Sequence, residues 1–360
     1  VRIIGDLPIY VSLDSADVWS ERREFLLDKA GRPSRVAGVP PDYFSEEGQL
    51  WGNPLYDWAA QKRDGFGWWI RRVEGASHLF DAIRIDHFRA FAQYWSVPAG
   101  AETAREGRWE TGPGMDLLGV LTNWFPHITY IAEDLGLLTP EVHQLRQTAG
   151  LPGMKVLEFA FDRPDNAYLP HNYNSARCVC YTGTHDNDTA LGWYDHAGEA
   201  ERAFAERYLG ASGREEVRKA LLRWGMGSTA ELFVAQMQDY LALGSEGRIN
   251  VPGVAEGNWR WRMAPDAVTP ALAAEIIREV DCLCAALAAG ETGPYLAEYR
   301  RRCVNLGRTV RLLRPDGGGE TAEALDIDEE FGLVVRRPDG AVKTVRSGEV
   351  SVRGLYGYTE

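Results

Sequence analysis

Short apolar runs that end in polar or acidic residues recur along the first two thirds of the chain, with helical stretches between them. Strands that alternate with helical segments favour parallel β/α architecture. In a (β/α)8 barrel, catalytic residues lie at the carboxyl ends of the strands. We count about six such units where a closed barrel needs eight, and the sequence therefore predicts a partial barrel. The runs are 2–4, 82–85, 129–132, 156–161, 178–181 and 231–235.

Three acidic residues, Asp86, Glu133 and Asp186, each stand just past one of these runs. If Asp86 and Glu133 end neighbouring strands, which lie about 4.8 Å apart, their carboxyl groups approach to roughly 5–5.5 Å. That separation suits a retaining glycoside mechanism, whereas an inverting mechanism needs a wider gap that admits water. A single charged residue at a strand end is commonly structural, and the three together favour catalysis.

The charge balance narrows the possible partners. The formal net charge of −13 at pH 7 argues against nucleic acid and anionic membranes, because both attract surfaces rich in Lys and Arg. The five Cys residues match neither a disulfide framework nor a zinc pattern, so we expect reduced thiols and a cytoplasmic protein. No apolar run approaches the ~18 residues of a membrane span. Twelve Trp and fifteen Tyr fit either sugar stacking or an ordinary core.

Two further segments differ from the strand and helix alternation. Residues 32–57 are rich in Pro, Gly and aromatic side chains, which predicts a long loop without secondary structure, either functional or a surface insertion. Composition changes after Met263, and the Ala-rich residues 265–303 have the apolar spacing of a helix. Beyond Gly307, the short runs TVRLL, ALDI, GLVVRR and VKTV with Asp-Gly turns predict a small antiparallel β module.

Six segments, in family order, carry a resemblance to the 4-α-glucanotransferases (amylomaltases) of the α-amylase superclan. AIRIDHFRAF resembles the nucleophile segment, IAEDLG the acid/base segment, and THDNDT the segment that brings a His-Asp pair to the sugar. GDLPIYVSLDSADVW, PPDYFSEEGQLWGNPLYDW, and the pair EGRINVPG and GNWRWRM resemble three more segments. The similarity runs from residue 1 to about residue 278.

The resemblance implies roles for individual residues. Asp86 is the nucleophile that forms a covalent glucosyl ester, Glu133 is the acid/base, and Asp186 holds sugar hydroxyls. Arg84 keeps Asp86 ionised, and the aromatic residues of the 40–58 segment exclude water, which separates a transferase from a hydrolase. The implied substrate-binding set is Asp6, Tyr43, Phe44, Glu46, Trp51, Asn53, Arg84, His185 and Asn250. For His87, sugar binding and packing are equally expected.

The function implied is transfer of α-1,4-glucan segments to a sugar acceptor by double displacement, with no metal and no cofactor. The implied partners are maltooligosaccharides and α-1,4-glucans, and the oligomeric state stays open. Alternatives are an inactive glucan-binding fragment or chimera, an α-amylase-type hydrolase, and an accessory fragment of a biotin ligase. The aromatic segment 40–58 argues against the hydrolase.

The two ends depart from the family pattern. Amylomaltases have a long stretch before the segment that opens this chain, so we expect an N-terminally truncated barrel, equivalent to strands 3–8, with open sheet edges. We therefore expect the chain to fold poorly or to be inactive alone.

Residues 294–313 and 347–358 resemble the end of a biotin–protein ligase, a helix and a small SH3-like barrel. The ligase's adenylate loop is missing, so we expect no biotinylation and only surface charge at Arg353. The expected domains are 1–278 (barrel), 279–303 (helical connector) and 304–360 (SH3-like module).

Overall fold

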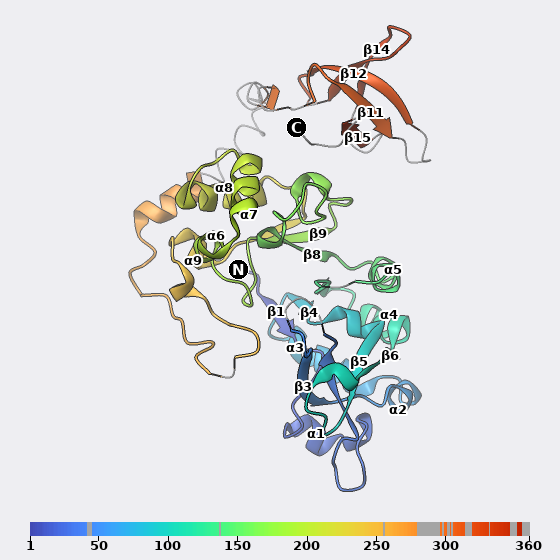
Figure 1. Cartoon of the computed structure of the whole chain (residues 1–360). Coiled ribbons are helices and arrows are strands. Elements are labelled where there is room, and N and C mark those ends of the chain that lie inside the picture. Colours follow the sequence, from blue (N-terminus) through green and yellow to red (C-terminus); the bar gives the residue numbers. More distant parts are fainter. Residues whose placement is uncertain are drawn as a thin grey trace. The chain divides into compact units, whose positions relative to one another are not determined.

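The computed structural model divides the 360-residue chain into two compact units, Val1–Met263 and Ala264–Glu360 (Figure 1). The boundary agrees with the predicted change after Met263. No helix among the described residues is long and apolar enough to cross a membrane. The structure describes residues 1–41, 45–136, 138–254, 256–278, 296, 299–300, 303, 305–313, 319–330, 332–345 and 351–354.

Six parallel strands form the frame of the first unit, as the sequence predicts. They make two three-stranded sheets, in the orders β1-β4-β7 and β10-β9-β8. The sheets adjoin at β7 and β8, where the Ala132 N–H donates to the Pro152 carbonyl oxygen at 2.9 Å. The strands are β1 (Ile4–Leu7), β4 (Ala82–Ile85), β7 (Thr129–Ala132), β8 (Gly153–Val156), β9 (Cys178–Tyr181) and β10 (Leu232–Val234).

Two predicted strand boundaries are wrong. The run 156–161 is not a strand, because β8 ends at Val156 and η4 (Leu157–Phe159), a 3-10 helix, follows. All four residues of β8 pair with β9, and the apolar residues continue past the last pair, which hides the boundary. The first strand is β1, not 2–4, so Asp6 lies inside a strand rather than past its end.

Residues 32–57 are not a structureless loop, contrary to the expectation. β2 (Arg35–Val39) and β3 (Gln49–Pro54) join β5 (Gln93–Pro98) and β6 (Arg108–Thr111) in an antiparallel sheet of order β3-β2-β5-β6. The glycines that suggested a loop shape this sheet instead. Gly48 turns the chain with φ +69°, and a β-bulge falls between Val36 and Gly38, where a Cβ on Gly38 would lie 2.6 Å from the Gln49 carbonyl oxygen.

Helices connect the strands of the first unit. The side chains of Asp57 and Thr189 cap α2 and α6 by accepting hydrogen bonds from backbone N–H groups. The helices are α1 (Ala16–Ser20), α2 (Trp58–Arg63), α3 (Gly67–Ser77), α4 (Gly114–Trp124), α5 (Pro140–Thr148), α6 (Ala190–His196), α7 (Glu199–Leu209), α8 (Arg214–Met226) and α9 (Met237–Tyr240). The other short 3-10 turns are η1 (Arg22–Glu24), η2 (Phe88–Phe91), η3 (Ala104–Glu106), η5 (Pro170–Asn172) and η6 (Ser245–Gly247).

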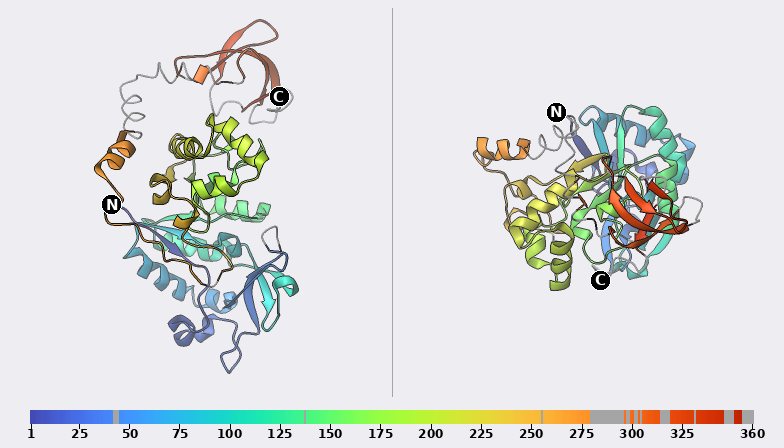
Figure 2. Two further views of the ribbon diagram at one scale, coloured as in Figure 1. Left: turned by 60° about the vertical axis from the view of Figure 1, so that its left-hand side comes forward. Right: turned by 90° about the horizontal axis from the view of Figure 1, so that it is seen from above.

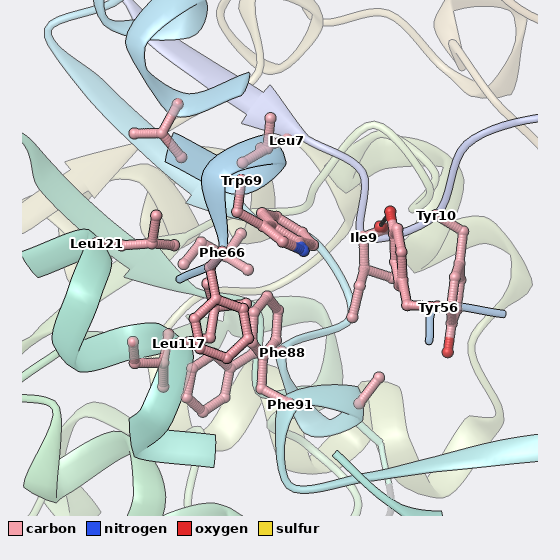
Figure 3. Close-up of a cluster of buried hydrophobic side chains, with 14 of the residues drawn as sticks. Leu7, Ile9, Tyr10, Tyr56, Phe66, Trp69, Phe88, Phe91, Leu117 and Leu121 are labelled. Atoms are coloured by element: carbon pink, nitrogen blue, oxygen red, sulfur yellow. Dashed lines mark hydrogen bonds between the residues drawn. The ribbon is translucent and has the colours of Figure 1, made fainter. Parts of the chain in front are cut away.

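Each parallel sheet packs against a hydrophobic cluster, and a further buried cluster, which includes Ile131 of β7, Val156 of β8 and Val179 of β9, joins the two sheets. Around the first sheet, aromatic rings dominate, and Figure 3 shows the rings of Tyr10 and Tyr56 side by side, 6.0 Å apart between centroids. The Tyr56 hydroxyl donates to the Ile9 carbonyl oxygen and so ties the segment after β3 to the segment after β1. On the second sheet, the buried cluster around Cys180 of β9 includes side chains from α6, α7 and α8, which are the yellow-green helices in Figure 2. Cys178 and Cys180 are buried free thiols, as expected.

The second unit contains a helix over 270–278 and a five-stranded antiparallel sheet of order β14-β13-β12-β11-β15. Four of the strands confirm the predicted module, and a small core that includes Val310, Ala324 and Val335 lies on the sheet. Most of the predicted helical connector, with Cys282 and Cys284, lies outside the described residues. The strands are β11 (Thr309–Leu313), β12 (Gly319–Ile327), β13 (Leu333–Arg336), β14 (Val342–Val345) and β15 (Ser351–Gly354).

Candidate active site

A single buried guanidinium organises the end of the first sheet. Asp6 on β1 stands opposite Arg84 on β4 in the strand register, and Asp86 follows β4 directly. Arg84 Nη1 donates to Asp6 Oδ1 at 2.7 Å and to Asp86 Oδ1 at 3.0 Å. The Arg84 side chain is only 10% exposed, whereas those of Asp6 and Asp86 are 42% and 38% exposed. The cation is therefore buried, whereas the two carboxylates that it bonds are partly exposed to solvent.

Two opposing effects act on Asp86. Burial raises the pKa of its carboxyl group, and the Arg84 guanidinium acts in the opposite direction by favouring the charged form. The negative charges of Asp6 and Asp186 also raise the pKa of Asp86, which means that all three carboxylates contribute to one local field.

Glu133 stands beside Asp86 on the neighbouring strand end. Ile85 and Ala132 are paired in register, and the Glu133 N–H donates to the Ile85 carbonyl oxygen at 3.0 Å. Glu133 Oε1 accepts from the Leu135 N–H at 3.2 Å. Burial, aided by the nearby charge of Asp86, raises the pKa of Glu133 to about 8 in spite of Arg84. At neutral pH Glu133 therefore carries a proton that it can donate.

Asp186 comes from the second sheet, in the segment after β9. The Asn250 side-chain amide donates to Asp186 Oδ1 at 2.6 Å, and His185 Nε2 lies 3.5 Å from Asp186 Oδ2. Arg248 donates to two backbone carbonyl oxygens, those of Asp186 at 2.6 Å and Asn250 at 2.9 Å. These bonds join the segment after β9 to the segment after η6, and they fix the carboxylate of Asp186.

Aromatic rings border both halves of the site. The Trp51 ring meets the His87 ring edge-on at 4.9 Å between centroids, and Tyr10 lies 6.1 Å from Trp51. Burial lowers the pKa of His87 to about 4, so the imidazole is neutral. On the other half, Trp259 is 56% exposed and its ring lies 5.2 Å from that of His185.

The remaining predicted site residues have different positions. Asn53 Nδ2 donates to the Val11 carbonyl oxygen at 3.0 Å, a bond that holds β3 to the segment after β1. Glu46 is exposed in the turn before β3. Tyr43 and Phe44 lie outside the described residues. Arg353 lies on β15, in the other unit.

Comparison with known proteins identifies the family to which this arrangement of carboxylates belongs. Residues 1–269 match the profile of glycoside hydrolase family 77, described as 4-alpha-glucanotransferase. The chain belongs to this family.

The 4-alpha-glucanotransferase of Thermus thermophilus is 55% identical over 277 residues, which are 75% of this chain and 55% of that protein. The chloroplastic/amyloplastic 4-alpha-glucanotransferase of Solanum tuberosum is 48% identical over 264 residues, 73% of this chain and 46% of that protein. The chain thus spans about half the length of the curated glucanotransferases that it matches.

Among solved structures, an amylomaltase from Streptococcus agalactiae in complex with acarbose aligns with a TM-score of 0.74 and 37% identity. The alignment covers 78% of this chain and 57% of that one. The second unit has a different similarity, because residues 306–353 match the profile of the biotin protein ligase C-terminal domain.

Three residues of the candidate site were missed by sequence reasoning. Arg248 and Trp259 fall in segments that the sequence marked as typical of the family, but their contacts with Asp186 and His185 depend on chain folding over more than 60 residues. Asp134 adjoins Glu133 in the sequence, and this adjacency is the signal that could have identified it. Its carboxylate accepts from the Met154 N–H at 2.7 Å and pairs with Arg146 at 2.9 Å.

Proposed function

We propose that the chain supplies the active site of a retaining 4-α-glucanotransferase. The observation that carries the proposal is the difference between two neighbouring strand ends. Asp86 is bonded to the Arg84 cation, whereas burial keeps Glu133 protonated at neutral pH. A retaining mechanism needs these two forms together, one carboxylate to attack and one acid to donate a proton.

In the first step, the Asp86 carboxylate attacks the anomeric carbon and forms an ester bond while the glycosidic C–O bond breaks. Glu133 transfers its proton to the departing oxygen and becomes a carboxylate. In the second step, Glu133 takes the proton of the acceptor's 4-hydroxyl, that oxygen attacks the anomeric carbon, and the ester bond breaks. Both residues return to their starting forms, so protons and electron pairs balance.

The bonds around Asp186 support a role in holding sugar hydroxyls. Asn250 occupies Asp186 Oδ1, which leaves Oδ2 on the His185 side to accept from a hydroxyl. Asp6 orients Arg84 from the opposite strand, and Trp51 offers a ring face to the glucan. The proposal extends to Tyr43, Phe44 and Glu46 as further members of the substrate surface, and it gives Asn53 a supporting role through β3.

We also propose that the six parallel strands are part of a (β/α)8 barrel, and that the sheet of the second unit is SH3-like. The unbroken parallel order on both sides of the β7/β8 contact supports the first idea. The profile match over 306–353 supports the second. The domain division 1–278, 279–303 and 304–360 stays a prediction, as does a cytoplasmic location.

Covalent trapping tests the proposed reaction. The full chain is incubated with 5-fluoro-α-glucosyl fluoride, and peptide mass spectrometry locates the label, which we expect on Asp86. The matched control is Asp266→Asn, an exposed carboxylate that should leave labelling unchanged, whereas Asp86→Asn should abolish it.

A maltotriose assay then identifies the acceptor. Glucose released together with longer oligomers supports the transferase. Label on Asp86 with glucose and maltose alone would indicate a hydrolase. Sugar binding without any label would leave a glucan-binding fragment and overturn the proposed activity for this chain.

A further inference from the structure

A tryptophan without a role in the reaction proposed above lies next to the residues around Asp186. Trp259 belongs to the irregular segment after η6, and its ring lies 5.2 Å from the His185 ring between centroids, with the two planes tilted by 38°. His185 in turn brings Nε2 to 3.5 Å from Asp186 Oδ2. The Trp259 ring is therefore one side chain away from the carboxylate proposed to hold sugar hydroxyls.

More than half of this tryptophan faces solvent. Trp259 is 56% exposed, whereas Trp69 on α3 is fully buried in the core of the first sheet. A tryptophan that serves packing buries its ring, because the indole carries a large apolar surface. Single exposed apolar side chains are nevertheless common on protein surfaces, so exposure needs a second observation before it assigns a role.

The backbone of Trp259 supplies that observation. Its φ of +61° lies in the left-handed region, where a bulky side chain is unfavourable and glycine is usual. Two hydrogen bonds hold the residue there, from the Trp259 N–H to the Ile249 carbonyl oxygen at 2.7 Å and from Arg262 Nη1 to the Trp259 carbonyl oxygen at 3.1 Å. Residues held in such conformations concentrate at functional sites.

The segment that carries Trp259 is braced and also reaches Asp186. The Asn258 side chain accepts from the Val251 N–H at 2.9 Å and donates to the Val251 carbonyl oxygen at 3.1 Å. Asn250, the residue before Val251, donates its side-chain amide to Asp186 Oδ1 at 2.6 Å. One braced segment therefore bonds the carboxylate and presents the exposed ring beside it.

The other half of the site has a similar pair of rings. Trp51 meets the ring of His87 at 4.9 Å between centroids, and His87 directly follows Asp86 in the sequence. In each half, a tryptophan thus contacts a histidine that adjoins one of the site carboxylates. A pyranose ring carries hydroxyls around its edge and C–H groups on its faces, so a carboxylate and an aromatic ring side by side suit one glucan.

We propose that the exposed face of Trp259 stacks on a glucose unit of the bound glucan. The unit is the neighbour of the one whose hydroxyls Asp186 holds, because the His185 side chain occupies the position next to the carboxylate. Trp259 is thus a substrate-binding residue whose contact requires a glucan of two or more units. This assignment deepens the function proposed above and rests on it.

Binding without turnover is the first test. The full chain carrying Asp86→Asn is titrated with maltohexaose by calorimetry, with and without Trp259→Ala. We expect Trp259→Ala to raise Kd about tenfold, which is about 1.4 kcal/mol, and Trp259→Phe to raise it no more than about threefold. The matched control, Trp124→Ala at the end of α4, removes a 63% exposed tryptophan and should leave Kd unchanged. An unchanged Kd in the Trp259→Ala protein overturns the proposal.

Donor length then separates sugar stacking from support of His185. In the chain with an intact Asp86, Trp259→Ala should lower kcat/KM for maltotriose at least about fivefold more than it lowers the rate of Asp86 labelling by the one-ring fluorinated donor. Equal losses with both donors would show that Trp259 acts through His185 on the reacting unit, which overturns the stacking role.

Melting followed by circular dichroism separates binding from folding. Trp259→Gly relieves the left-handed backbone, so it should melt at least as high as Trp259→Ala while binding maltohexaose equally weakly. A melting temperature roughly 5 °C or more below the wild type in both variants would show that Trp259 is a packing residue and would overturn the proposal. If the wild type takes no label and Kd still depends on Trp259, the proposed reaction fails and the stacking role stands.

Discussion

At the scale of single residues, Arg84 gives two neighbouring carboxyl groups different chemical states. Asp86 accepts a direct bond from the guanidinium, whereas Glu133 lacks such a bond and is dominated by burial. The same cation therefore bonds the carboxylate proposed to attack, while at the proposed proton donor its charge lowers the pKa without overcoming burial. This division of roles depends on one Nη1 atom that bonds only the aspartates.

The raised pKa of Glu133 predicts an alkaline limit for glucan transfer. Because the donor must be protonated, kcat/KM for maltotriose should fall about tenfold per pH unit above pH ~8. With an α-glucosyl fluoride donor, whose leaving group needs little protonation, the rate of Asp86 labelling should show no decline between pH 7 and 9. An equal decline with both donors would place the titration on another group.

The bond between Asn250 and Asp186 predicts a defined loss on truncation. Asn250→Ala removes the donor to Asp186 Oδ1 and should lower kcat for maltotriose transfer by about 10- to 30-fold, the value of about 1.5–2 kcal/mol for a bond to a charged group. Asn123→Ala, which removes an exposed amide on α4, is the matched control and should leave kcat unchanged. If Asn250→Ala keeps full kcat, Asp186 is held by Arg248 and His185 alone.

Most of the candidate residues could be predicted from the sequence because they follow apolar runs or sit in recognisable segments. Asp86, Glu133 and Asp186 belong to this group. Their partners could not be predicted in the same way. Arg248 acts through backbone carbonyl oxygens, so only the folded chain shows what it contacts.

At the scale of elements, strand register is what brings the site together. Asp6 faces Arg84 because β1 and β4 are parallel and in register, and Asp86 and Glu133 are adjacent because β4 and β7 are paired up to Ile85 and Ala132. The sequence could predict these strands by their apolar runs. It could not predict the β2–β3 pair, because Gly and Pro at bulges and turns have the same appearance as Gly and Pro in a loop.

The contact between β7 and β8 predicts a stabilising role for Asp134. Asp134→Ala removes the acceptor of the Met154 N–H and the partner of Arg146, and should lower the free energy of unfolding by about 2–4 kcal/mol. Asp134→Asn keeps an oxygen for Met154 and should lose about half as much. Urea unfolding followed by tryptophan fluorescence measures both, and equal losses in the two variants would mean that the ion pair alone matters.

The position of Trp51 on β3 predicts an effect on water rather than on folding. Its ring covers His87 and is partly exposed, so Trp51→Ala should raise the ratio of hydrolysis to transfer roughly fivefold or more while Trp51→Phe stays near the wild type. The measurement is free glucose against longer oligomers from maltotriose at equal turnover. An unchanged ratio in Trp51→Ala would remove the tryptophan from the water-excluding surface.

At the scale of the whole molecule, the carboxylates proposed for catalysis belong entirely to the first unit. The sequence could predict the division, since composition changes after Met263, and could not predict whether the units depend on each other. The second unit has its own sheet and its own small core.

The separation of the two cores predicts that the proposed active site of the first unit works without the second unit. A chain that ends at residue 278 should take the fluorinated donor at Asp86 at a rate within about twofold of the full chain. Its melting transition for the first unit should also remain. A labelling rate that falls tenfold or more on truncation would show that the second unit supports the site.

The contact between β7 and β8 has a consequence for how the protein responds to heat. Glu133 stands on one side of it and Asp186 on the other, and the bonds that cross it include the N–H groups of Ala132 and Met154. Those two amide hydrogens should exchange with deuterium earlier than their neighbours within each sheet. If this contact opens, the proposed proton donor moves away from the carboxylate proposed to hold the sugar, while both sheets stay folded. Thermal inactivation should therefore precede the loss of secondary structure that circular dichroism measures.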